Sequence, residues 1–214
     1  MTASLVIFDH DGVLVDSESI AMELLAGIST DLGYPLSVDQ AFARYLGTSF
    51  GFVVEDLRAQ GADVDADELH RDFHRDLFDA FRARLEPIPG VPELLDSLAA
   101  QRRTIAIASS GSSERVNLGI TSTRIDHHFA DSVITTADHV TRGKPFPDLF
   151  LTTAERAGID PSECIVIEDS PFGVEAAQRA GMRVIGFAYQ TPEDKLAAAD
   201  WVVRDMREVE RILL

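Results

Sequence analysis

Short apolar runs alternate with segments of helical periodicity along most of this 214-residue chain. Continuous apolar runs bounded by polar residues are typical of strands that are covered on both faces, as in parallel sheets. In chain order, the runs are Leu5–Phe8, Thr104–Ala108, Ser132–Thr135, Cys164–Ile167, Arg183–Phe187 and Trp201–Val203. The helical segments between them include Val91–Gln101, Asp148–Ala157 and Pro171–Ala180. This alternation predicts an α/β fold with a doubly wound, Rossmann-like parallel sheet.

The stretch between the first two runs differs from the rest, because it has no strand-like run. It contains the amphipathic segments Ile20–Leu32, Val38–Leu46, Phe50–Gln60 and Ala66–Leu85, and a proline-rich turn follows them. We therefore predict two domains. An α/β core is formed by residues 1–16 and 85–214, and an all-helical cap domain of residues 17–84 is inserted after the first strand.

The charge of the chain limits its partners. With 19 Lys and Arg against 36 Asp and Glu, the net charge is −17. Such a field repels nucleic acid and anionic lipid, and it repels small phosphates unless a metal ion reverses it locally. The start of the chain does not resemble a signal peptide, and the single cysteine, Cys164, fits a reducing compartment. We expect a cytoplasmic, monomeric protein with a small-molecule partner.

Oxygen-bearing side chains follow three of the predicted strands. Ligands of open α/β sheets bind beyond the carboxyl ends of the strands, where these side chains would meet. Singly, each could be an ordinary turn or helix-capping residue, but their joint occurrence favours a site. The side chains are Asp9 and Asp11 after the first strand, Ser109 and Ser110 after the second, Glu168 and Asp169 at the fourth, and Lys144 in a loop before a helix.

Several carboxylates at close range need a counter-charge, and a hard cation such as Mg²⁺ supplies one. Asp9 could then act as a nucleophile that forms an aspartyl-phosphate. Asp11, two residues further on, could protonate the leaving group and later activate water. Ser109, Ser110 and Lys144 could hold phosphoryl oxygens.

Four segments together resemble the motifs of the haloacid dehalogenase superfamily. The first is FDHDGVLVDSE at Phe8–Glu18, and the second is ASS at Ala108–Ser110. The third is GKPFPD at Gly143–Asp148, and the fourth is VIEDSPFGVEAA at Val166–Ala177. The chain is most similar to the β-phosphoglucomutase-like and sugar-phosphatase branch, in which a small helical cap follows the first motif.

The resemblance implies a role for each matching residue. Asp9 matches the phosphorylated nucleophile and Asp11 the acid/base, while Ser109 and Lys144 match the phosphate ligands. Asp169 matches the Mg²⁺-binding carboxylate. Asp9, the backbone carbonyl of Asp11 and Glu168, the last of these through water, would complete the metal site.

Three functions remain open at this point: a Mg²⁺-dependent phosphatase for a sugar or polyol phosphate, a β-phosphoglucomutase-type mutase, and a non-enzymatic phosphate-accepting receiver. Receivers resemble the core alone, without the cap. Relatives that are mutases carry a histidine and an arginine in the cap where this chain has Ala21 and Phe50, which favours hydrolysis.

Two further expectations concern His10 and the cap. His10, between the two aspartates, is expected to be a surface-directed side chain, or else a pH-sensitive neighbour of both. Substrate contacts from the cap are expected from Glu18, Thr48, Ser49 and Phe50.

Overall fold

The computed structural model describes residues 3–214. The chain divides into two compact units. One consists of the residues up to Asp16 together with Glu86–Leu214, and the other is Ser17–Leu85. Each unit is described by itself below.

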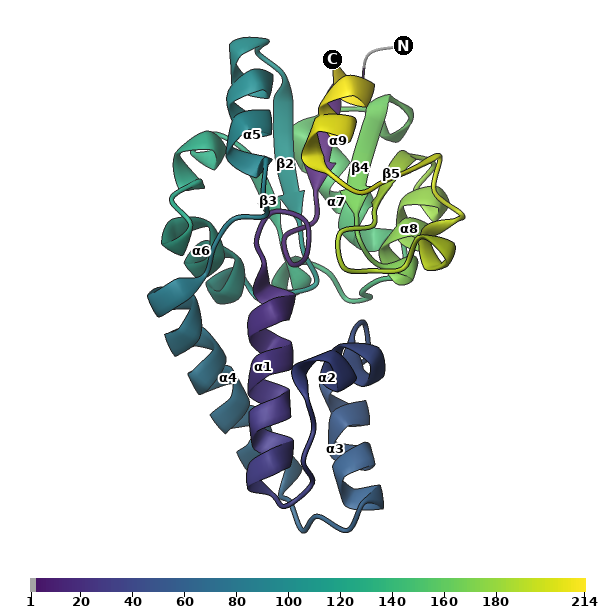
Figure 1. Cartoon of the computed structure of the whole chain (residues 1–214). Helices are drawn as coiled ribbons and strands as arrows, with labels where there is room; N and C mark the ends of the chain where they lie inside the picture. The colour runs from purple at the N-terminus through teal and green to yellow at the C-terminus, as the bar shows by residue number, and fades with distance from the viewer. Residues whose placement is uncertain (1–2) are drawn as a thin grey trace. The chain divides into compact units, whose positions relative to one another are not determined.

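The larger unit contains a parallel sheet, which confirms the predicted α/β fold (Figure 1). Within residues 3–214, the sheet has six strands in the order β3-β2-β1-β4-β5-β6. This order places β1 at the centre. From β1 the chain adds β2 and β3 on one side and then β4, β5 and β6 on the other, as in Rossmann-like folds. The strands are β1 (Leu5–Phe8), β2 (Thr104–Ala108), β3 (Val133–Thr135), β4 (Cys164–Glu168), β5 (Arg183–Phe187) and β6 (Trp201–Val203).

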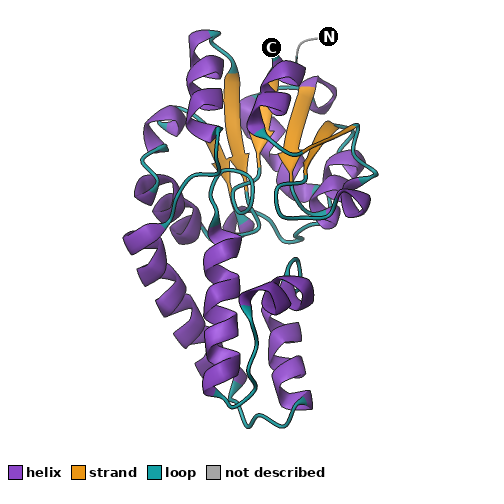
Figure 2. Ribbon diagram, viewed as in Figure 1, coloured by secondary structure: helices purple, strands orange, loops and turns teal. Residues whose placement is uncertain are grey.

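Helices cover both faces of this sheet (Figure 2). Helices α7 (Asp148–Ala157) and α8 (Pro171–Arg179) pack on one face, and α5 (Val91–Ala100) and α9 (Met206–Leu213) lie on the other. Helix α6 (Ser113–Ser122) follows β2. Covered strands explain why the apolar runs are continuous rather than alternating.

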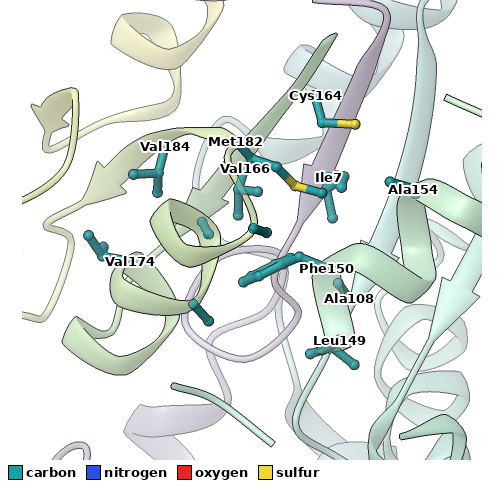
Figure 3. Packing of buried hydrophobic residues seen from close by; sticks show 14 of the residues in the cluster. Ile7, Ala108, Leu149, Phe150, Ala154, Cys164, Val166, Val174, Met182 and Val184 are labelled. Atoms are coloured by element: carbon teal, nitrogen blue, oxygen red, sulfur yellow. The ribbon is translucent and has the colours of Figure 1, made fainter. Parts of the chain in front are cut away.

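The face under α7 and α8 forms a continuous apolar core (Figure 3). Phe150 of α7 is fully buried there, together with Ile7 of β1 and Val166 of β4. Cys164 belongs to the same core, and burial, with the charges of Asp160 and Glu163, raises the pKa of its thiol to about 11. The cysteine is therefore a packing residue.

In the smaller unit, residues 17–85, the regular secondary structure is all helical, and turns and loops connect the helices. Its elements are α1 (Ser17–Asp31), α2 (Val38–Tyr45), α3 (Phe50–Ala59) and α4 (Ala66–Arg84). Polar N-caps begin α2, α3 and α4, at Ser37, Ser49 and Asp65. Phe73, Leu77 and Phe81 recur every four residues and form the buried face of α4. Among all the described residues, no helix is both long and apolar enough to cross a bilayer.

Candidate active site

The register of the central strands brings the predicted site residues together. Phe8 at the end of β1 pairs with Ile107 of β2 and Ile167 of β4. The next residue along, Asp9, therefore lies level with Glu168, and its N–H donates to the Ile167 carbonyl at 3.0 Å. The strand pairing thus places the acidic side chains at one edge of the sheet.

Lys144 joins two of these carboxylates. Its Nζ lies 2.7 Å from Oδ1 of Asp9 and 2.7 Å from Oε2 of Glu168. The three side chains are almost fully buried. Burial alone would lower the pKa of Lys144, but the charges of Asp9 and Glu168 raise it above its usual value, so the ammonium stays charged.

Asp9 remains short of compensating charge despite this contact. Burial and the charge of Glu168 raise the pKa of Asp9 to about 8, against the opposing effect of Lys144. An additional cation beside Asp9 would relieve this cost of ionisation, because a nearby positive charge favours the carboxylate form.

The acidic cluster fits a hard divalent cation. Carboxylate oxygens of Asp9, Glu168 and Asp169 all lie within 4.8 Å of one another. Glu168 is already engaged elsewhere: Oε2 accepts from Lys144, and Oε1 accepts from the Ser170 hydroxyl at 2.7 Å and the Ser170 N–H at 3.1 Å. Oxygen ligands of this kind suit Mg²⁺, which also keeps several waters.

Two glycines make room for this cluster. Gly12 has a φ of +76°, and a Cβ at this position would lie 2.1 Å from Oδ2 of Asp169. A Cβ at Gly173 would lie 2.0 Å from the carboxyl carbon of Glu168. A larger side chain at either position would therefore displace a carboxylate.

Arg115 of α6 binds the carboxylate of Asp11. Oδ1 of Asp11 accepts from Nη2 at 2.7 Å and from Nε at 3.0 Å, while Oδ2 lies 3.2 Å from Nε. Burial alone would raise the pKa of Asp11, but the guanidinium, assisted by His10, holds it well below its usual value. In this arrangement Asp11 is ionised.

His10 does not point to the surface, so the first expectation for it is wrong. Its side chain is fully buried, with Nδ1 3.3 Å from Oδ2 of Asp11. Among residues 3–214, Nε2 has no hydrogen-bond partner. The ring fits against Gly119 of α6, where a Cβ would lie 2.2 Å from Nε2. Burial against a glycine is a property of the packed helix that the sequence alone does not reveal.

The two serines after β2 differ in environment. Ser109 is buried, and its Oγ accepts the Gly111 N–H at 2.9 Å. Ser110 is exposed. The Ser109 hydroxyl thus stabilises the turn of this loop while its proton remains available to an acceptor.

The expected cap residues all lie in the helical unit, and three of them make local contacts. Thr48 donates to the Tyr45 carbonyl at 2.8 Å, and Ser49 caps α3 by accepting from the Phe52 N–H at 3.2 Å. The Phe50 ring packs with those of Phe73 and His70, each at 5.1 Å between centroids. Glu18 lies in the first turn of α1.

Sequence reasoning missed Arg115. One signal was available: it stands in the first turn of a helix that Ser112 caps, where the helix dipole disfavours a cation. A basic residue in such a position indicates a compensating anion nearby, but which anion depends on how α6 packs.

These features define an enzyme site of acidic and basic side chains at the carboxyl edge of a parallel sheet. The model of the haloacid dehalogenase-like hydrolases matches residues 6–187. The chain belongs to this family, which confirms the predicted superfamily and enzyme class.

Similar proteins include phosphatases. Validoxylamine A 7'-phosphate phosphatase of Streptomyces hygroscopicus subsp. limoneus is 31% identical over 95% of this chain and 94% of its own length. Fructose-1-phosphate phosphatase YqaB of Escherichia coli is 29% identical over 84% and 93%. The structure of a haloacid dehalogenase-like protein from Agrobacterium tumefaciens has a TM-score of 0.88 and 32% identity, over 99% and 97%.

One relative is much longer. The chloroplastic protein SUPPRESSOR OF QUENCHING 1 of Arabidopsis thaliana is 33% identical over 85% of this chain, which spans only 17% of that protein. The shared region therefore also occurs within a larger polypeptide.

The close fit of His10 against α6 gives a first prediction. Gly119→Ala should lower the free energy of unfolding by about 1–3 kcal/mol, because the added methyl group overpacks a buried ring. In a His10→Ala background the same change should cost much less. Gly27→Ala in α1 is the control, since nothing lies within 4 Å of its Cβ position.

Urea unfolding of the four proteins in the His10 and Gly119 cycle measures this coupling. Additive effects of the two substitutions would contradict the packing of His10 against Gly119.

Proposed function

We propose that this protein is a Mg²⁺-dependent phosphatase that hydrolyses a small sugar or polyol phosphate through an aspartyl-phosphate on Asp9. The observation that carries the proposal is the buried Asp9–Lys144–Glu168 contact, with Asp169 beside it. Similarity to the fructose-1-phosphate and validoxylamine A 7'-phosphate phosphatases supports the substrate class.

In the first step, a carboxylate oxygen of Asp9 attacks phosphorus while the bond from phosphorus to the leaving oxygen breaks. The ammonium of Lys144 neutralises charge on the phosphoryl oxygens, and the Ser109 hydroxyl donates to one of them. Asp11 gives its proton to the leaving alkoxide. Because Asp11 is ionised in the arrangement described above, it must take up this proton when the substrate binds. Oδ2 is the oxygen placed to receive it, because its contacts to Arg115 and His10 are the longer ones, at 3.2 and 3.3 Å.

In the second step, Asp11 is a carboxylate and takes a proton from water. The water oxygen attacks the phosphorus of the aspartyl-phosphate, the acyl–phosphate bond breaks, and Asp9 is restored as phosphate leaves. The same residue therefore acts as acid and then as base.

Asp9, Asp169 and the backbone carbonyl of Asp11 are the proposed protein ligands of Mg²⁺, with Glu168 acting through water. When bound, the ion supplies charge neutralisation at the phosphoryl group. The raised pKa of Asp9 supports this assignment, since burial and Glu168 bring it to about 8 without the ion. Cytoplasmic location and a monomeric state stay predictions.

Asp9→Asn should abolish phosphate release, because an amide cannot form the acyl-phosphate. The fold should persist, since removing one charge from an acidic cluster relieves repulsion. Phosphate release and circular dichroism are the measurements. Turnover above a few per cent of wild type, with deamidation excluded by mass spectrometry, would refute the covalent step.

Chelation with EDTA should remove activity and Mg²⁺ should restore it. Ca²⁺ should inhibit, because it is larger and takes more ligands, which loosens in-line geometry. Phosphate release from a sugar phosphate after exhaustive chelation is the measurement. Undiminished activity without metal would show that the acidic cluster has another purpose.

The mutase alternative is tested with β-glucose 1-phosphate and a trace of the 1,6-bisphosphate. The protein should release phosphate or leave the ester unchanged, without accumulating glucose 6-phosphate. Phe50 packs against Phe73 and offers no guanidinium for a distal phosphate. Arg44 pairs with Asp56, and Arg58 donates to the Val64 carbonyl at 2.9 Å, so both arginines are engaged within the cap.

A coupled dehydrogenase assay and a phosphate assay, run in parallel, separate the two activities. Glucose 6-phosphate formed faster than phosphate would favour the mutase.

A further inference from the structure

Arg115 is the second cation of the site, and its side chain is partly buried. The aliphatic part of its side chain lies against the loop after β2, where a Cβ at Gly111 would be 3.1 Å from its Cδ. The side chains of Arg115 and Asp11 are only 16% and 18% exposed. A largely desolvated ion pair of this kind is stronger than one on the surface.

The position of Arg115 carries an electrostatic cost. Ser112 caps α6, and Arg115 accordingly stands in its first turn, near the positive end of the helix dipole. A cation there is unfavourable unless an anion compensates it. Asp11 is that anion, so the contact between the two residues is what makes the arginine acceptable at this position.

The ion pair with Arg115 also stabilises Asp11 among the neighbouring carboxylates. Asp9, two residues earlier, and the carboxylates of Glu168 and Asp169 occupy the same edge of the sheet. Lys144 is committed to Asp9 and Glu168, at 2.7 Å from each. Without Arg115, like-charge repulsion would favour orientations of Asp11 that point away from the cluster.

We propose that Arg115 is a positioning residue for the acid/base step: it fixes the orientation of the Asp11 carboxylate through Oδ1, so that Oδ2 is the oxygen left for proton transfer. The unequal contacts support this, because Oδ1 receives the two shorter ones from Arg115, at 2.7 and 3.0 Å, while Oδ2 lies 3.2 Å from Nε of Arg115 and 3.3 Å from Nδ1 of His10. This inference rests on the proposed phosphatase function.

Leaving-group dependence distinguishes this role from substrate binding. An alkyl leaving group needs a proton, and an aryl leaving group such as p-nitrophenolate needs little. Arg115→Met keeps the aliphatic side chain and removes the guanidinium. It should lower kcat about 10- to 100-fold on an alkyl phosphate, in the range expected for a misplaced catalytic group. The loss on p-nitrophenyl phosphate should be smaller, and KM should change less than about threefold.

Three variants complete the kinetic test. In an Asp11→Asn background, Arg115→Met should change kcat less than about twofold, because the group it positions is already gone. Arg115→Lys should recover part of the activity, since it keeps the charge without the planar fork. Arg204→Met is the matched control, because Arg204 pairs with Glu193 at 2.6 Å with 72% of its side chain exposed, and kinetics should be unchanged.

Unfolding of the same four proteins of the Asp11 and Arg115 cycle reports on the contact without any activity. Non-additive melting temperatures are expected. A rise in KM with kcat retained would make Arg115 a substrate ligand and overturn the proposal, as would equal losses on alkyl and aryl esters or an unchanged kcat.

If the wild-type protein hydrolyses no phosphate ester with Mg²⁺ present, the proposed function fails. The unfolding cycle then tests only the contact between Arg115 and Asp11. Non-additive effects of the two substitutions on the melting temperature would support the contact, and additive effects would overturn it.

Discussion

The site depends on one buried ammonium group. Lys144 lies between Asp9 and Glu168, and its two 2.7 Å contacts allow a carboxylate at the end of β1 and one at the end of β4 to stay side by side away from water. Removing it would leave buried charges uncompensated, which costs several kcal/mol. Because β1 and β4 are neighbours in the centre of the sheet, the strand pairing brings these two carboxylates together, and Lys144 compensates their charge.

Small residues complete the arrangement by letting charged groups approach the backbone. Gly12 accommodates Asp169, and Gly173, in the first turn of α8, accommodates Glu168. Gly119 does the same for the ring of His10, one helical turn after Arg115 on the same face of α6. Two contacts thus join α6 to the loop after β1: the ion pair between Arg115 and Asp11, and the packing of the His10 ring against Gly119.

The sheet and the acidic edge were predictable because they follow from local patterns. Apolar runs locate the strands, and parallel pairing carries Asp9 and Glu168 to one edge. The positions of His10 and Arg115 were not predictable, because both depend on how α6 packs against the loop after β1. Ser49 illustrates another limit: the sequence suggested substrate contact, but the side chain caps α3, and a serine serves either purpose.

Counting charges explains how an acidic protein can take an anionic substrate. The net charge is −17, which disfavours phosphate at long range. Locally, with all four side chains ionised, the carboxylates of Asp9, Asp11, Glu168 and Asp169 face the cations of Lys144 and Arg115, so the formal sum is −4 + 2 = −2. This excess of negative charge agrees with the raised pKa of Asp9. One divalent cation brings that sum to zero. Metal binding would then convert a site that repels phosphate into a neutral one in which the Lys144 ammonium and the Ser109 hydroxyl attract it, so the affinity for phosphate should depend on the metal.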